Sequence, residues 1–206
     1  KPAKTVLDFD KTKIAVGAQN VYWEPKGAFT GEVSVPMLKD VHCTCSIVGH
    51  SERRGYFGET NEDVNRKVRA LLDGGLYAVA CVGESLSVRD EGGAEEFVCA
   101  QVRAAFAGLE PEEAGKCVVA YEPIWAIGTG RTATPEQAQD MCAAIRATLA
   151  DMFGAETADE MRILYGGSMS VGNVEQLLAQ PDIDGGLVGG ASLKVDQFVR
   201  LVKACL

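Results

Sequence analysis

Short apolar runs recur along the chain, each followed by a glycine-rich or polar loop and then by a stretch of helical periodicity. The runs are almost continuously apolar, which is typical of strands that helices cover on both faces, and this favours a parallel sheet. The pattern predicts six strands, at residues 13–20, 45–51, 77–84, 117–123, 161–167 and 184–191. No linker interrupts the alternation, so we expect one α/β domain over residues 1–206.

Helix signals lie between these runs. Thr60 and Asp63 predict the start of a helix whose apolar residues share one face and which ends at the glycine pair 74–75. Thr134 to Gln137 forms a capping box, with Pro135 at the first helical position, and opens a helix to about residue 154. A last apolar stripe comprises Val195, Phe198, Val199 and Val202.

Two architectures fit this order, an open doubly wound sheet and a (β/α)8 barrel. His50, Glu84, Glu122 and the segment 166–168 each fall at the carboxyl end of a different predicted strand, at the edge where α/β folds place their chemistry. An open sheet usually binds phosphate at its first glycine-rich turn, but the chain has no GxGxxG or GxxxxGK[ST] pattern. Its glycine pairs lie at the ends of the last two predicted strands instead, which is the position of a barrel's phosphate site.

Composition restricts the function classes. Twenty Lys and Arg against 29 Asp and Glu give a net charge of −9, which argues against a nucleic-acid or anionic-membrane partner. The apolar runs are too short for a membrane span, and the first residues do not resemble a signal peptide, so the expected location is cytoplasmic. Seven cysteines without a CxxC pair indicate reduced thiols rather than disulfides.

One cluster could suggest a metal site. His42, Cys43 and Cys45 lie close together in the sequence. Neighbouring strand residues point to opposite faces, however, and no fourth ligand is apparent, so we predict no metal.

Several motifs together resemble the triose-phosphate isomerase family. They are AQN (18–20), GAFTGEVS (27–34), GHSERR (49–54), CVGE (81–84), AYEPIWAIGTGRTAT (120–134), YGGS (165–168) and LVGGASLK (187–194). The resemblance implies a TIM barrel that interconverts dihydroxyacetone phosphate and D-glyceraldehyde 3-phosphate without a cofactor, in glycolysis and gluconeogenesis. Interconversion of a ketose and an aldose phosphate requires one proton to move between adjacent carbons through an enediolate.

The same resemblance assigns the catalytic groups. Glu122 would be the carboxylate base and His50 the imidazole that polarises the carbonyl, with Ser51 and Glu52 supporting the site. Taken alone, a glutamate at a strand end is more often a cap or salt-bridge residue, and a lone histidine is more often structural. The motif around each residue favours the catalytic interpretation.

Phosphate binding and a lid are also implied. Gly128, Ser168, Gly189 and Gly190 would bind the phosphate, because small residues let a dianion approach backbone N–H groups. Residues 123–133 resemble a lid that keeps the enediolate away from water. Its parts and contacts would be Pro123, Trp125, Ile127, Thr129 and, from the YGGS motif, Tyr165 and Ser168.

The GAFTGEVS loop implies a symmetric homodimer. In the family the loop enters a neighbouring subunit, so Thr30 would help to complete the partner's site. The alternative is that Phe29 folds back onto its own barrel.

The chain departs from the family pattern at its start. Family members open with a strand that carries N-x-K, whose lysine lies beside the substrate oxygens, and the first strand-helix-strand segment is absent here. A barrel of eight strands takes ~250 residues, so roughly 45 residues of the pattern are missing. We therefore expect these 206 residues alone to be inactive. The rival interpretations are another phosphate-binding barrel, such as an epimerase or an indole glycerol phosphate synthase, and a barrel that only binds sugar phosphate or a partner chain.

Overall fold

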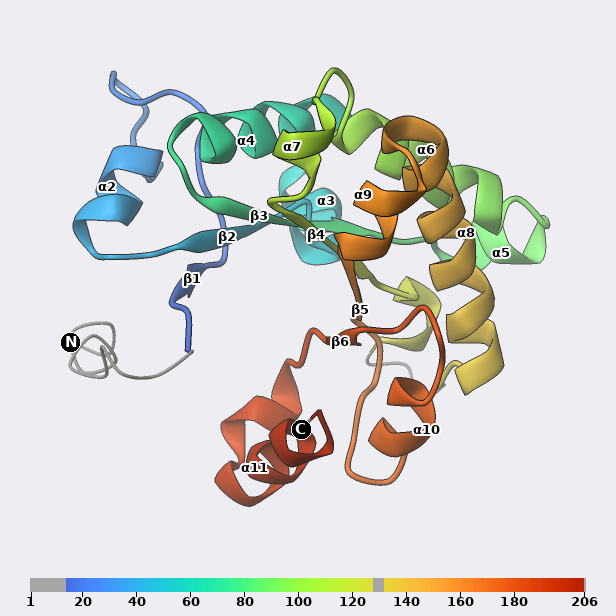
Figure 1. The fold of residues 1–206 in the computed structure, drawn as a ribbon. Coiled ribbons are helices and arrows are strands. Elements are labelled where there is room, and N and C mark those ends of the chain that lie inside the picture. Colours follow the sequence, from blue (N-terminus) through green and yellow to red (C-terminus); the bar gives the residue numbers. More distant parts are fainter. Residues whose placement is uncertain (1–13, 128–131, 206) are drawn as a thin grey trace.

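A curled parallel sheet of six strands organises the chain (Figure 1). The computed structural model describes residues 14–127 and 132–205. The strands are β1 (Gly17–Ala18), β2 (Cys45–Val48), β3 (Tyr77–Val82), β4 (Cys117–Tyr121), β5 (Arg162–Tyr165) and β6 (Gly185–Gly186). All six predicted strands are confirmed, although each is shorter than expected.

The strand order decides between the two architectures. Each strand pairs in parallel with the next one along the chain, in the order β1-β2-β3-β4-β5-β6. A doubly wound sheet reverses its order at a switch point, whereas a barrel does not. The sheet is therefore part of a (β/α)8 barrel. Within the described residues β1 and β6 do not pair with each other, so the ring of strands is open between them.

Helices connect the strands, and Figure 1 shows α4, α6, α7, α8 and α9 along one side of the curled sheet. The helices are α2 (Val35–Asp40), α3 (Ser51–Phe57), α4 (Asn61–Asp73), α5 (Leu86–Asp90), α6 (Ala94–Ala105), α7 (Pro111–Ala114), α8 (Pro135–Phe153), α9 (Ala155–Glu160), α10 (Val174–Leu178) and α11 (Val195–Ala204), with 3-10 turns η1 (Ile124–Ala126) and η2 (Gly190–Leu193).

The predicted helix ends are confirmed. Thr60 and Asp63 form a capping box at the start of α4, and Thr134 and Gln137 form one at the start of α8. The chain leaves α4 through Gly75, whose φ of 76° is a left-handed conformation that glycine adopts without strain.

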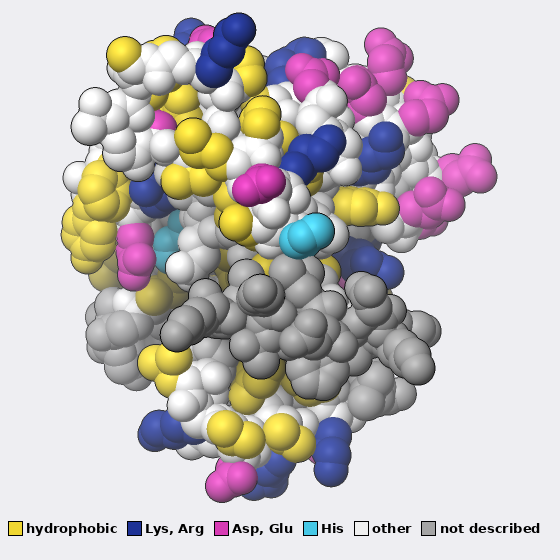
Figure 2. Space-filling model, turned by 90° about the vertical axis from the view of Figure 1, so that its left-hand side faces the viewer, with side chains coloured by type: hydrophobic (Ala, Val, Ile, Leu, Met, Phe, Trp, Pro, Cys, Tyr) yellow, Lys and Arg dark blue, Asp and Glu magenta, His cyan; other side chains and the backbone are white. Residues whose placement is uncertain are grey.

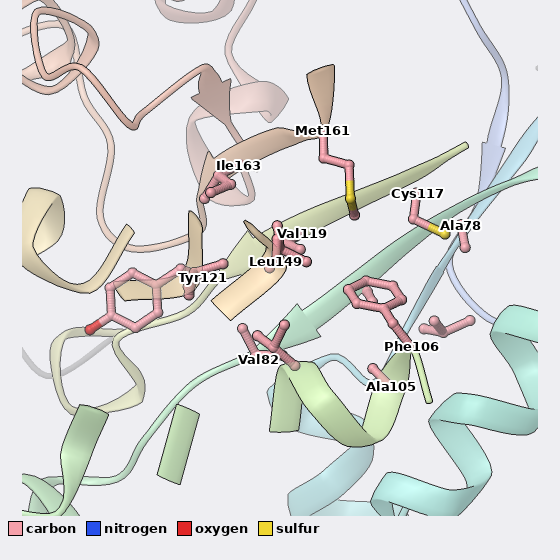
Figure 3. Close-up of a cluster of buried hydrophobic side chains, with 14 of the residues drawn as sticks. Ala78, Val82, Ala105, Phe106, Cys117, Val119, Tyr121, Leu149, Met161 and Ile163 are labelled. Atoms are coloured by element: carbon pink, nitrogen blue, oxygen red, sulfur yellow. The ribbon is translucent and has the colours of Figure 1, made fainter. Parts of the chain in front are cut away.

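Side chains on both faces of the central strands are buried. Figure 3 shows Val119 and Tyr121 of β4 near Ile163 of β5, with Phe106 nearby. All four side chains are at most 1% exposed. Burial of each contributes roughly 1.5–3 kcal/mol to the free energy of unfolding, so this cluster fixes the strands that carry the site.

The last helix is confirmed, but its apolar stripe is not buried. Phe198 and Val199 are 41% and 44% exposed, whereas Leu201 is 3% exposed. α11 contacts α10 and η2. Apolar side chains lie open among Lys and Arg at the foot of the molecule, where Figure 1 places these helices (Figure 2). In the described part of the chain, no helix has the length and apolar character needed to cross a membrane.

Candidate active site

The carboxyl ends of the strands meet at one cleft, as the sequence pattern predicts. The cleft has a volume of about 780 Å³. Seven residues singled out from the sequence line it, namely His50, Glu52, Glu122, Ile127, Ser168, Gly189 and Gly190. These residues come from loops after β2, β4, β5 and β6, so the sheet gathers groups that lie far apart in the sequence.

Glu122 lies at the base of this cleft with its side chain only 2% exposed. Its Oε1 is 3.1 Å from His50 Nε2. Ser51 holds the same carboxylate through both of its donors, with the hydroxyl 2.8 Å from Oε1 and the backbone N–H 2.9 Å from Oε2. Three donors thus fix one buried carboxylate at the edge of the sheet, so its position is well defined.

The other ring nitrogen of His50 determines its tautomer. Nδ1 accepts the Glu52 backbone N–H at 3.3 Å, where the chain enters α3. A nitrogen that accepts carries no proton, so the neutral ring carries its proton on Nε2. That proton points at Glu122. The Glu52 carboxylate is 4.0 Å from Nδ1 and 72% exposed, so it lies at the rim of the site.

A second buried carboxylate holds the start of the predicted lid. Glu84 is fully buried, and its Oε1 accepts from Trp125 Nε1 at 2.7 Å, Arg89 Nη1 at 3.0 Å and the Tyr121 hydroxyl at 3.1 Å. The Arg89 guanidinium also lies over the Trp125 ring, 4.6 Å from its centroid. Burial, together with the Glu84 charge, raises the pKa of Tyr121. Tyr121 therefore stays protonated and acts as a donor.

Two residues of the YGGS motif lie beside the same segment. The Ser168 hydroxyl donates to the Ala126 carbonyl at 3.1 Å. The Tyr165 hydroxyl is buried and has no hydrogen-bond partner within the described residues. Burial and the nearby Cys142 raise the pKa of Tyr165 to about 12, so the hydroxyl keeps its proton and is an unused donor.

The glycine pair 189–190 leaves open space at the cleft. A Cβ built on either residue would meet no atom of the described residues within 4 Å. An anion can therefore approach this backbone closely. Two other predicted residues, Gly128 and Thr129, lie outside the described residues.

Sequence reasoning missed a charged cluster beneath His50. Glu59 accepts from Lys67 Nζ and Arg53 Nε, both at 2.7 Å, and from the Gly49 backbone N–H at 2.8 Å. Burial alone would raise the pKa of Glu59, but the hydrogen bonds from Lys67 and Arg53 and the Lys67 charge outweigh it and lower the pKa. The only sequence signal was a lysine on the apolar face of α4. The cluster fixes the turn from β2 into α3, which carries His50.

Thr30 lies away from the cleft, on an exposed loop. The neighbouring Phe29 ring is 4.7 Å from the Tyr22 ring and 40% exposed. Phe29 therefore packs within its own loop and still presents much of its surface.

His42, Cys43 and Cys45 do not form a metal site with other groups. Across residues 14–127 and 132–205, no three His, Cys, Asp or Glu side chains are arranged to hold a metal ion.

Comparison with known proteins identifies relatives over nearly the whole chain. The sequence model of the triosephosphate isomerase family matches residues 2–205. A triosephosphate isomerase of Chloroflexus aurantiacus is 59% identical over 189 residues, which are 92% of this chain and 76% of that protein. One from a Roseiflexus species is 58% identical over 191 residues, 93% of this chain and 75% of the relative. One from Lactobacillus delbrueckii subsp. lactis is 51% identical over 191 residues, with 93% and 76% covered.

Proposed function

The chain belongs to the triosephosphate isomerase family, and on this premise we propose that the natural protein interconverts dihydroxyacetone phosphate and D-glyceraldehyde 3-phosphate. The reaction moves one proton between neighbouring carbons through an enediolate, as a step of glycolysis and gluconeogenesis. One observation carries the proposal: a buried carboxylate and an imidazole, 3.1 Å apart, line a cleft that is also lined by open glycine backbone.

Glu122 is the base in this proposal, and His50 is the electrophile. The carboxylate removes the proton from one substrate carbon and returns it to the next. The His50 Nε2 proton, which points at Glu122 in this structure, turns to the substrate carbonyl oxygen and stabilises the developing negative charge. The combination of a carboxylate base with a neutral imidazole is known from the triosephosphate isomerase family itself. No cofactor is needed, because the reaction is a proton transfer.

Gly189, Gly190 and Ser168 bind the phosphate group in this proposal, and Gly128 is assigned the same role. The dianion lies against backbone N–H groups in the space that the absent Cβ atoms leave. A phosphate held there directs the other end of a three-carbon substrate toward Glu122 and His50, which line the same cleft.

Residues 123–133 form the lid in this proposal. The Glu84 bond to Trp125 fixes one end of the segment, and Ile127 contributes an apolar side chain at the cleft. The unused Tyr165 hydroxyl supports a second position of the lid, because a buried donor without a partner is costly unless another conformation satisfies it. Closure excludes water, and in water an enediolate phosphate eliminates phosphate to give methylglyoxal.

Tyr165→Phe tests the lid. We expect the free energy of unfolding to stay the same or rise by about 1 kcal/mol, because the lost hydroxyl has no partner in this structure. We also expect a larger ratio of methylglyoxal to isomerised product, measured by product analysis. Tyr77→Phe serves as the control, because Tyr77 is exposed at the amino end of β3, and it should change neither value. An unchanged product ratio in Tyr165→Phe contradicts this role.

A homodimer is the proposed assembly, with the loop around Thr30 entering the partner subunit. The exposed Phe29 supports this, since aromatic residues are enriched in protein–protein interfaces relative to the rest of the surface. The proposed location is the cytoplasm. All seven cysteines are free, as expected in a reducing compartment.

Isomerisation in D2O tests the proposed reaction. Transfer through Glu122 exchanges the mobile proton with solvent, so the product and the recovered substrate should carry deuterium at the carbon next to the carbonyl. NMR of both species measures this. Rapid isomerisation without any solvent deuterium would indicate a hydride shift and contradict the proposed mechanism.

A further inference from the structure

The carboxyl end of β3 extends beyond its neighbour β2. Odd-numbered residues of β3 direct their backbone groups toward β2, as the Tyr77 N–H to Thr44 carbonyl bond of 2.9 Å shows, and even-numbered residues face β4. β2 ends at Val48. The Cys81 carbonyl and the Gly83 N–H therefore point to a side where no strand residue lies opposite them.

Two side chains take the place of the missing strand. Arg54 Nη2 donates to the Cys81 carbonyl at 3.3 Å. Gln101 of α6 accepts the Gly83 N–H on its Oε1 at 2.7 Å, and this bond is buried. Gln101 as a whole is only 5% exposed. Without this acceptor the Gly83 N–H would be a buried donor with nothing to bind.

Gly83 is also in direct contact with the backbone of Glu122. A Cβ on Gly83 would clash with the Glu122 carbonyl oxygen and would lie 3.2 Å from the Glu122 Cβ. Hydrogen bonds on either side complete the contact. The Glu122 N–H donates to the Val82 carbonyl at 2.8 Å, and the Ile124 N–H donates to the Glu84 carbonyl at 3.2 Å. The backbone of residues 82–84 is thus the surface on which the Glu122 backbone rests.

We propose that Gln101 is a positioning residue for the Glu122 carboxylate. By holding the Gly83 N–H, Gln101 fixes the backbone on which Glu122 rests, and so sets where the carboxylate meets the substrate. Gln101 acts from α6, behind the sheet, and does not line the cleft. The inference rests on the proposed function, in which Glu122 is the base.

The size of the effect follows from the demands of proton transfer. A displacement of about 1 Å between reacting groups costs up to about a hundredfold in rate. The described residues proposed to bind the phosphate lie after β5 and β6, whereas Gln101 binds Gly83, after β3. A loosened Glu122 should therefore lower kcat and leave KM nearly unchanged, and this split separates positioning from a general loss of structure.

Gln101→Met and Gln101→Glu test the proposal in the natural protein. Methionine matches the length of glutamine but lacks the acceptor, so we expect kcat to fall by about tenfold or more, with KM within about twofold. Glutamate keeps an acceptor oxygen in either protonation state, so we expect it to restore most of the lost kcat. If Gln101→Met does not fold, Gln101→Asn gives the readout, because it withdraws the acceptor by one methylene.

Gln139→Met is the matched control. Gln139 of α8 accepts the Asp182 backbone N–H on Oε1 at 3.0 Å, which is the same kind of bond at a loop that does not contact Glu122. We expect Gln139→Met to lower the melting temperature and leave kcat unchanged.

Three results overturn the positioning role. The first is an unchanged kcat in folded Gln101→Met, or in Gln101→Asn where that variant replaces it. The second is an equal loss of kcat in Gln139→Met, and the third is a Gln101→Glu protein that folds but is as slow as Gln101→Met. A parallel assay of Glu122→Asp keeps the two proposals separate. Normal turnover in that variant refutes Glu122 as the base, whereas an unaffected Gln101→Met refutes only the positioning.

Discussion

Glu122→Asp lowers kcat by about a hundredfold and changes KM by less than about threefold. The substitution keeps the charge but withdraws the carboxylate by one methylene, or ~1 Å, from the substrate carbon. It also lengthens the contacts with Ser51 and with His50 Nε2, which are 2.8–3.1 Å in this structure. The glycine pair 189–190 is untouched, so substrate binding should persist. Steady-state kinetics in both reaction directions measure the split.

Glu62→Asp provides the control for the chemistry of the substitution. Glu62 lies exposed in the first turn of α4, so the same loss of a methylene there should leave turnover unchanged. Circular dichroism of Glu122→Asp should match that of the natural protein, since the shorter carboxylate stays in a polar environment. Turnover near the natural level in folded Glu122→Asp would mean that another group removes the proton.

The parallel sheet and its helix ends were predictable because they depend on local signals. Apolar runs identified all six strands, and the capping boxes at Thr60 and Thr134 fixed the starts of two helices. The strand ends were less predictable. A strand continues only as far as its neighbours supply hydrogen bonds, and β1 and β6 have two residues each because within the described part each pairs on one side only.

The cleft residues were predictable to a similar degree. His50, Glu122, Ser168 and the glycine pair 189–190 follow strands, and parallel strands bring their carboxyl ends together. The residues behind the cleft depend on tertiary contacts that no spacing reveals. Gln101, for example, shares the buried face of α6 with Val98, Val102 and Ala105.

A polar side chain on an apolar helix face is the signal that could have identified Gln101. The same signal marks Lys67, which is buried among Val64, Val68 and Leu71 on α4 and binds Glu59. On α4 the amphipathic pattern predicts the helix correctly, and on both helices the polar exception identifies a contact with the loops of the site. What the sequence does not contain is the partner, since Glu59 and Gly83 are brought there by the fold.

Thr30→Arg is expected to convert the proposed homodimer into monomers with strongly reduced turnover. Thr30 is exposed at the loop tip, so arginine is accommodated in the free subunit at little cost. In the dimer the guanidinium would be buried without a counter-ion, which costs about 3 kcal/mol or more. A two-fold dimer contains the contact twice, so the dissociation constant should rise by at least about ten-thousandfold.

Sedimentation equilibrium measures the assembly, and turnover at matched subunit concentrations measures the consequence for the site. Thr44→Arg is the control, because Thr44 is also exposed but lies at the amino end of β2, at the opposite edge of the sheet. It adds the same charge and should leave both values unchanged. Since Glu122 and His50 are identical in the two variants, loss of turnover in Thr30→Arg alone would mean that the partner's loop contributes to the site. A Thr30→Arg protein that dimerises with natural affinity and retains full turnover would exclude the loop from the interface.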